Sequence, residues 1–186
     1  MIYLIGGSPR VGKSILGQRV SARLKIGWIS TDLLLELLRL KDEAGVKKVW
    51  DGSPEAIAKA AEWFYPYLER FVWGVSAHAE SYLIEGVDFL PAQIVKLSKR
   101  FPSRAVFLGC SRMTLEQLTQ FPGCSPGYAR LPIEMQRVIV QDVPVWSEYI
   151  RQEATRSGCI YVDMSGDFSS RLDEAESVLT SEAKNK

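Results

Sequence analysis

The feature that most constrains this chain is the segment Gly-Ser-Pro-Arg-Val-Gly-Lys-Ser at residues 7–14. It matches the pattern G-x-x-x-x-G-K-[ST], follows the apolar run 2–5 and precedes an amphipathic stretch at 13–25. A tight turn between a strand and a helix directs backbone N–H groups and the positive end of the helix towards an anion. The segment therefore predicts a strand, a P-loop and a helix that together bind a nucleoside triphosphate.

The residue types within this motif have separate physical roles. Gly7 and Gly12 allow the turn, Lys13 would reach the β- and γ-phosphates, and the Ser14 hydroxyl would complete the coordination of Mg²⁺. Arg10 has two interpretations, a solvent-facing side chain or a phosphate contact. The expected cofactors are Mg²⁺ and ATP, with GTP as an alternative. The expected nucleotide site consists of Gly7, Ser8, Pro9, Arg10, Val11, Gly12, Lys13, Ser14 and Ile15.

The composition is typical of one globular domain over residues 1–186, with 46% hydrophobic and 24% charged residues. A net charge of +1 gives no overall attraction to nucleic acid or to a membrane surface. The three cysteines, at 110, 124 and 159, lack the spacing of a zinc site or a disulfide framework. With no leader and no apolar run near twenty residues, we expect a cytoplasmic monomer or homodimer without membrane or nucleic-acid partners.

Five short apolar runs alternate with helical stretches along the chain. Such continuous runs are typical of a parallel sheet that is covered on both faces. The sequence therefore predicts an α/β fold, a five-stranded parallel sheet in the three-layer P-loop NTPase arrangement, with ligands at the carboxyl ends of the strands. The strands are expected at 2–5, 26–29, 82–84, 105–108 and 159–162, and the helices at 13–25, 33–41, 54–79, 91–100, 114–120, 132–157 and from about 170.

Two segments interrupt this regular alternation. Residues 33–79 are longer than one crossover needs, and we call them the helical insert. Aromatic residues recur there at helical spacing, among them Trp63, Tyr67 and Phe71, with Trp50 before them, so core packing is the first interpretation and a substrate wall the second. Residues 121–131 are rich in glycine and proline and predict a mobile loop. We call residues 121–137 the lid segment. Residues 181–186 are expected to be disordered.

Two common classes of P-loop protein lack their signatures here. The guanine-reading N-K-x-D loop is missing, since the chain has one asparagine, Asn185, and no Asp-Glu pair ends an apolar strand. Instead, Asp32 follows the second predicted strand, on the sheet edge beside the P-loop. Its carboxylate could accept a proton from an attacking hydroxyl or could cap the following helix, and the two roles are compatible.

At this point the sequence resembles the small-molecule P-loop kinases related to adenylate and gluconate kinases. The loop G-G-S-P-x-x-G-K-S, the pair Thr31-Asp32 and the segment Leu-Ile-Glu-Gly-Val-Asp-Phe-Leu-Pro at 83–91 look most like 2-phosphoglycerate kinase-related proteins. Chloramphenicol phosphotransferase and zeta toxin are looser relatives. The resemblance implies an ATP-dependent phosphotransferase that moves the γ-phosphoryl group to a hydroxyl of a small metabolite, with Lys13 and Asp32 as catalytic groups.

The resemblance also implies roles for further charged residues. Glu85 and Asp88 would orient Mg²⁺ through water or hold a substrate hydroxyl, and the alternative is that one of them caps the helix at Pro91. Arg130 and Arg137 would close over the triphosphate from the lid segment and take part in catalysis. The alternative for these arginines is the solvated surface.

The nucleotide base has an expected place as well. Arg112, after the fourth strand, would stack on adenine, and residues 165–167 would border the base. A competing function remains open at this stage. The chain could be a non-catalytic or weakly hydrolytic NTP-binding regulator that acts through a protein partner.

Overall fold

The computed structural model describes residues 1–41, 51–78, 81–120 and 126–181 of the 186-residue chain. The expected strands and helices all occur, with ends within about three residues of those predicted. Residues 126–130, expected as loop, form a short 3-10 helix instead. The elements are β1 (Ile2–Gly7), α1 (Lys13–Leu24), β2 (Gly27–Ser30), α2 (Thr31–Arg39), α3 (Pro54–Ala77), β3 (Tyr82–Glu85), α4 (Pro91–Ser98), β4 (Ser103–Gly109), α5 (Leu115–Gln120), η1 (Pro126–Arg130), α6 (Ile133–Ser157), β5 (Ile160–Asp163) and α7 (Phe168–Thr180). The expectations for Trp50, Cys124, the loop at 121–125 and the tail after Ser181 lie outside the described residues.

The strands form one parallel sheet in the order β2-β3-β1-β4-β5. This confirms the predicted fold class. β2 lies at the edge of the sheet as expected, but β3 separates it from β1. In the register between β1 and β3, Ile5 of β1 lies opposite Glu85 of β3. The strand next to the P-loop strand therefore ends in Glu85, and Asp32 lies one strand farther away than the sequence suggested.

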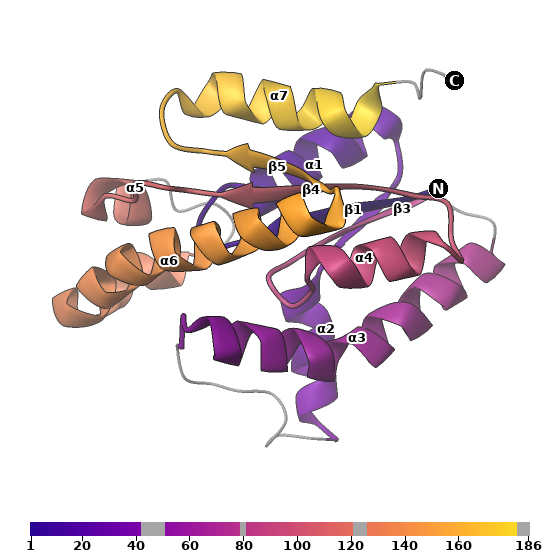
Figure 1. Ribbon diagram of the computed structural model, residues 1–186, viewed down its shortest axis with the longest axis horizontal. Coiled ribbons are helices and arrows are strands. Elements are labelled where there is room, and N and C mark those ends of the chain that lie inside the picture. The colour runs from indigo at the N-terminus through magenta and orange to yellow at the C-terminus, as the bar shows by residue number, and fades with distance from the viewer. Residues whose placement is uncertain (42–50, 79–80, 121–125, 182–186) are drawn as a thin grey trace.

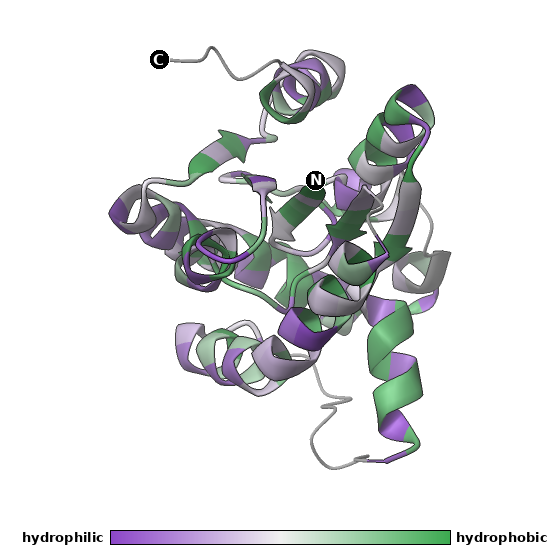
Figure 2. Ribbon diagram, turned by 90° about the vertical axis from the view of Figure 1, so that its right-hand side faces the viewer, coloured by the Kyte–Doolittle hydropathy of each residue, from purple (hydrophilic) through white to green (hydrophobic). Residues whose placement is uncertain are grey.

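Alternate residues of the central strands enter two hydrophobic clusters, one on each face of the sheet. Ile5 and Val106 pack with α1 and α7, whereas Leu4 and Phe107 pack with α3 and α4. Figure 1 shows α1 and α7 on one side of the sheet and α3, α4 and α6 on the other. In Figure 2 the central strands are coloured as hydrophobic. This three-layer packing is the reason that the strands read as continuous apolar runs.

Helix α6 belongs to both clusters. Ile139 and Val143 pack into the cluster that contains α1 and α7, while Trp146 and Ile150 pack into the cluster that contains α3 and α4. The change occurs around Pro144, a proline inside the helix. The middle of α6 therefore joins the packing of one face of the sheet to that of the other.

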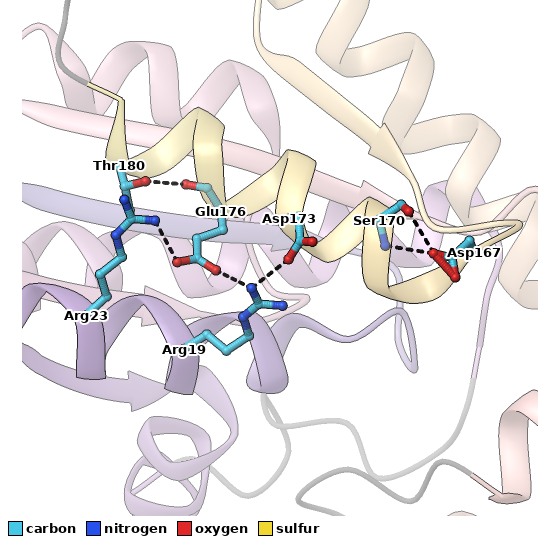
Figure 3. Close-up of polar contacts among 7 residues, drawn as sticks. All are labelled: Arg19, Arg23, Asp167, Ser170, Asp173, Glu176 and Thr180. Atoms are coloured by element: carbon cyan, nitrogen blue, oxygen red, sulfur yellow. Dashed lines mark hydrogen bonds and ion pairs between the residues drawn. The ribbon is translucent and has the colours of Figure 1, made fainter.

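Charged residues hold α1, the helix that follows the P-loop, against α7 (Figure 3). The Arg19 Nη2 atom lies 2.7 Å from Asp173 Oδ1 and 2.7 Å from Glu176 Oε2, and Arg23 Nη1 lies 3.0 Å from Glu176 Oε1. Glu176 is 8% exposed, so this carboxylate is shared by two arginines in a largely buried position. These ion pairs anchor α1 to α7.

Candidate active site

The P-loop has the backbone geometry that its glycines allow. Gly7 has φ of 127° and Gly12 has φ of 92°, both in the range that L-residues rarely adopt. A Cβ atom on Gly7 would lie 1.9 Å from the carbonyl oxygen of Leu108. The loop therefore cannot keep this path next to β4 with a side chain at position 7. Arg10, with φ of 62°, adopts a left-handed conformation without being glycine, which is energetically unfavourable.

Lys13 is the first residue of α1 and is 7% exposed. Its Nζ donates to the carbonyl oxygen of Ser8 at 2.6 Å, so the ammonium lies folded back over the P-loop. Burial lowers the pKa of Lys13, and the nearby carboxylates of Glu85, Asp32 and Asp88 oppose that shift. The structure thus gathers the predicted cation and three predicted acids around one point.

Glu85 ends β3, is 2% exposed and accepts a hydrogen bond from Ser14 Oγ to its Oε1 at 3.0 Å. Its proposed alternative role as a helix cap is wrong for this residue and for Asp88. The N-cap of α4 is Leu90, whose N–H donates to Gln93 Oε1 at 2.9 Å. Both acids are therefore available to the site.

Asp88 accepts a hydrogen bond from Thr31 Oγ1 to its Oδ2 at 2.6 Å. Burial raises the pKa of this carboxyl to about 6, since the hydrogen bond from Thr31 only partly offsets the loss of hydration. The negative charge of nearby Asp32 raises the pKa further. Asp88 is therefore a partly buried acid that changes its charge near pH 6.

Asp32 lies in the first turn of α2 and is exposed. The interpretation of Asp32 as the helix cap is wrong, because Ser30 is the N-cap and accepts the Asp32 N–H at 3.3 Å. An acid in the first turn still interacts favourably with the helix dipole. Its carboxylate lines the same cavity as Lys13, Glu85 and Asp88.

These groups border a cavity of about 770 Å³. The P-loop contributes residues 9–15 to its wall, and the three acids lie beside them. The other walls are mainly apolar and come from several elements. One group of lining residues consists of Leu35, Ile57, Ala60, Val87 and Trp146, and another consists of Met113, Leu131, Met164 and Phe168. A volume of this size with a few convergent polar groups is typical of a small-molecule site.

Arg10 does not face solvent, contrary to one of its two interpretations. It lines the cavity, its Nη2 donates to the carbonyl oxygen of Leu118 at 2.8 Å, and its guanidinium carbon lies 4.9 Å from the centre of the Tyr128 ring. Burial lowers the pKa of this guanidinium. The P-loop is thus joined to α5 and to η1, which is part of the lid segment.

Three predicted arginines lie elsewhere. Arg112, Arg130 and Arg137 are exposed, and within the described part of the chain none of them lines the cavity. The Arg112 N–H instead donates to Ser165 Oγ at 3.0 Å, which joins the loops after β4 and β5. Asp167 caps α7 by accepting the Ser170 N–H at 3.0 Å. Met113, Met164 and Phe168, which are near these polar residues in the sequence, line the cavity instead.

Sequence reasoning missed several polar residues of the site, among them Thr31 and Arg39. Thr31 carries the hydroxyl that binds Asp88. Arg39 lines the cavity and pairs with Glu36 at 3.2 Å. Its position seven residues after Asp32 is a usable signal, because residues separated by two helical turns lie on the same face.

The pair formed by Ser14 and Glu85 fits a Mg²⁺ ion bound together with a nucleotide. Among the residues that the structure describes, no three His, Cys, Asp or Glu side chains could hold a metal by themselves. Mg²⁺ in such sites takes one or two protein ligands, and phosphate oxygens and water supply the remainder. A hydroxyl and a buried carboxylate 3.0 Å apart meet this requirement.

Across the described ranges, no helix is long and apolar enough to cross a membrane.

Comparison with solved structures identifies the fold. The chain is similar to a gluconokinase from Sinorhizobium meliloti 1021, with 16% identity, a TM-score of 0.57 and coverage of 95% of this chain and 90% of that chain. A shikimate kinase from Bacteroides thetaiotaomicron matches with 14% identity, a TM-score of 0.55 and coverage of 96% and 98%. A shikimate kinase from Acinetobacter baumannii in complex with shikimate matches with 15% identity, a TM-score of 0.52 and coverage of 96% and 90%.

Sequence comparison gives no such match. No protein-family model matches the chain, and no curated protein sequence matches it significantly. Identities of 14–16% show the fold and leave the particular resemblance to 2-phosphoglycerate kinase-related proteins unconfirmed. The chain has the three-layer fold of small-molecule P-loop kinases.

Proposed function

We propose that this protein is an ATP-dependent phosphotransferase that moves a γ-phosphoryl group to a hydroxyl of a small metabolite. The observation that carries the proposal is the gathering of Lys13, Ser14 and three carboxylates at one cavity beside the P-loop. Phosphoryl transfer needs positioning and charge neutralisation more than covalent chemistry, and this arrangement provides for both. GTP is an alternative donor.

On the donor side, the P-loop N–H groups and the start of α1 would hold the phosphates. Lys13 would exchange its hydrogen bond to the Ser8 carbonyl for the transferring phosphoryl group. Ser14 would coordinate Mg²⁺, and Glu85 would orient it through water. The apolar side chains of Met113, Met164 and Phe168 would flank the base, close to the position first expected for Arg112.

On the acceptor side, we assign the proton-accepting role to Asp32. Glu85 and Asp88 each accept a hydrogen bond from a neighbouring hydroxyl, whereas Asp32 is exposed at the cavity. General-base help from a carboxylate requires such access to the substrate hydroxyl. Asp88, held by Thr31, would bind a second polar group of the acceptor.

The lid segment and the helical insert would complete the site. α2 and α3, which belong to the insert, already supply cavity residues such as Leu35 and Ile57. Tyr128 and Leu131 of the lid segment do the same on the other side. Arg130 and Arg137 would need to turn towards the phosphates when the segment closes, as lids of this kind do.

The test is nucleotide turnover with Mg²⁺-ATP in the presence and absence of pooled small hydroxyl compounds. A kinase should release ADP slowly alone and much faster when its acceptor is present, with formation of a phosphorylated product. The Lys13→Ala variant serves as the control for contaminating activity. If nucleotide binds but no pool accelerates turnover, the result supports the alternative of an NTP-binding regulator.

A further inference from the structure

We propose that Ser147 is a positioning residue that holds the P-loop in shape through Ser8. This rests on the proposed function only in that the loop is taken to bind nucleotide. Ser147 lies in the middle of α6, 139 positions from Ser8, and both side chains have 0% exposure. Their Oγ atoms are 2.6 Å apart. Among the described residues, neither serine lines the cavity, so Ser147 would act indirectly, through the residues that it binds.

The hydrogen-bonding capacity of Ser147 determines the direction of this contact. A serine hydroxyl has one proton to donate and two lone pairs to accept with. Ser147 Oγ donates to the Val143 carbonyl at 2.6 Å and accepts the Cys110 N–H at 2.8 Å. Ser8 must therefore donate to Ser147. The hydroxyl of Ser147 is then fully used, in a position that water does not reach.

Ser8 in turn is held at its backbone. Its N–H donates to the Leu108 carbonyl at 3.0 Å, and its own carbonyl accepts from Lys13 Nζ at 2.6 Å. With the side chain bound to Ser147, the residue is held at three points. The orientation of the loop just before the phosphate-binding turn, and the resting position of Lys13, therefore depend on a hydroxyl in α6.

The chain contains a matched serine pair that can serve as a control. Ser98 Oγ donates to the Ile94 carbonyl one turn earlier at 2.8 Å, and it lies 2.6 Å from Ser103 Oγ. The bonding pattern is similar, but this pair is exposed and lies at the start of β4, at the opposite end of that strand from the P-loop. Ile150→Val, one turn after Ser147, is a second control, because it weakens α6 packing without touching the hydroxyl.

The first measurement is hydrogen exchange in the absence of nucleotide. Loss of a buried hydrogen bond corresponds to about a tenfold change in an opening equilibrium. In Ser147→Ala we expect the amide of Ser8, which donates to the Leu108 carbonyl, to exchange about tenfold faster, while Ser98→Ala and Ile150→Val leave it within about twofold. Ser8→Ala removes the same bond from the other side and decides the matter if Ser147→Ala does not fold. Unchanged exchange in the loop of a folded variant overturns the proposal.

The second measurement is the affinity for a non-hydrolysable ATP analogue. Ser147→Ala and Ser8→Ala should each raise Kd about tenfold, and the double variant should add little, because the bond between Ser8 and Ser147 is absent from all three. Additive effects would show that the two serines act separately and would overturn the proposal. If the wild-type protein binds no nucleotide, the proposed function fails, and the exchange comparison still decides the role of Ser147.

Discussion

The P-loop and the lid segment border the same cavity, yet their polar and charged side chains lie in different places relative to it. On the P-loop side, Lys13 and Ser14 have hydrogen-bond partners within the site, on Ser8 and Glu85. On the lid side, apolar residues such as Tyr128 and Leu131 line the cavity, while Arg130 and Arg137 lie exposed outside it.

The two sides of the cavity are held in place differently. A turn fixed by glycines and by contacts with β4 keeps its shape alone, because its bonds are internal to the protein. Arg130 and Arg137 keep their hydration on the surface, whereas burial of an unpaired charge is costly. Under the proposed function, we therefore expect the P-loop side to be preformed and these two arginines to reach the phosphates only when nucleotide is bound.

The largest effect is expected for Lys13→Ala. Removal of the charge that meets the transferring group should lower turnover about 10³-fold. Steady-state kinetics with Mg²⁺-ATP and the acceptor measure this, and Lys99→Ala, an exposed lysine at the end of α4, is the control. Wild-type turnover in Lys13→Ala would contradict the proposed function. It would also contradict the view that the P-loop side of the cavity binds the phosphates.

The next effect concerns the acceptor side. Asp32→Asn should lower transfer about 10²-fold, near the low end for general-base help, because a loose transition state leaves the acceptor proton in place until late. ATP affinity and Tm should stay close to those of wild type, since Ser30 caps α2. Full activity with the true acceptor would move the base to Glu85 or Asp88.

The charged form of Asp88 is expected to destabilise the folded state at neutral pH and above. Its folded pKa of about 6 exceeds the ordinary 3.8, so the folded state binds the proton more tightly than the unfolded state does. The contribution of Asp88 to the free energy of unfolding therefore falls as pH rises from about 4 to about 6, and the penalty is complete above that range. Asp88→Asn should be more stable than wild type by about 3 kcal/mol at pH 8 and should lose most of this advantage at pH 4. Urea unfolding at both pH values checks this, and an equal difference at both would contradict it.

A smaller effect is expected from closure of the lid segment. With a non-hydrolysable ATP analogue and acceptor present, hydrogen exchange over residues 126–137 should slow about tenfold, while the core of β1 changes little. Mass spectrometry of the free and bound protein gives both values. Equally slow exchange without ligand would show that the segment is a fixed surface, and the comparison between the two sides would fail.

The smallest effect concerns the anchor behind α1. Glu176→Gln should lower stability by about 1 kcal/mol at low salt and by less at high salt, since it weakens contacts to Arg19 and Arg23. ATP affinity should not change, because the P-loop keeps its own bonds. Glu174→Gln, which disturbs an exposed pair with Arg171, is the control and should have little effect. A parallel loss of ATP affinity in Glu176→Gln would show that the P-loop depends on α7.

The sequence predicted the elements well because their signals are local. Apolar runs, helix caps and the spacing of Gly7, Gly12 and Lys13 each depend on neighbouring residues. The position of Glu85 next to the P-loop depends instead on strand order, which the strands' own residues do not encode. The N-cap of α2 was missed because Ser30 and Asp32 are both good caps and lie two residues apart.

Side-chain direction limited the remaining predictions. Arg10 and Arg130 both follow glycine and proline residues in the sequence, yet only Arg10 lines the cavity, where it contacts Leu118 and the Tyr128 ring. Ser147 had no local signal at all, since its partner Ser8 is 139 residues away in the chain. Contacts of this kind appear only when the elements are assembled.

The sharing of α6 between the two hydrophobic clusters has a consequence for how the protein unfolds. Layers that meet only at a sheet can loosen one at a time, as separate units with separate free energies of opening. Here Val143 and Trp146 lie within one turn of the same helix, and each packs into the cluster on a different face of the sheet. We therefore expect the two layers to open as one cooperative unit, so that a destabilising substitution on either face weakens both.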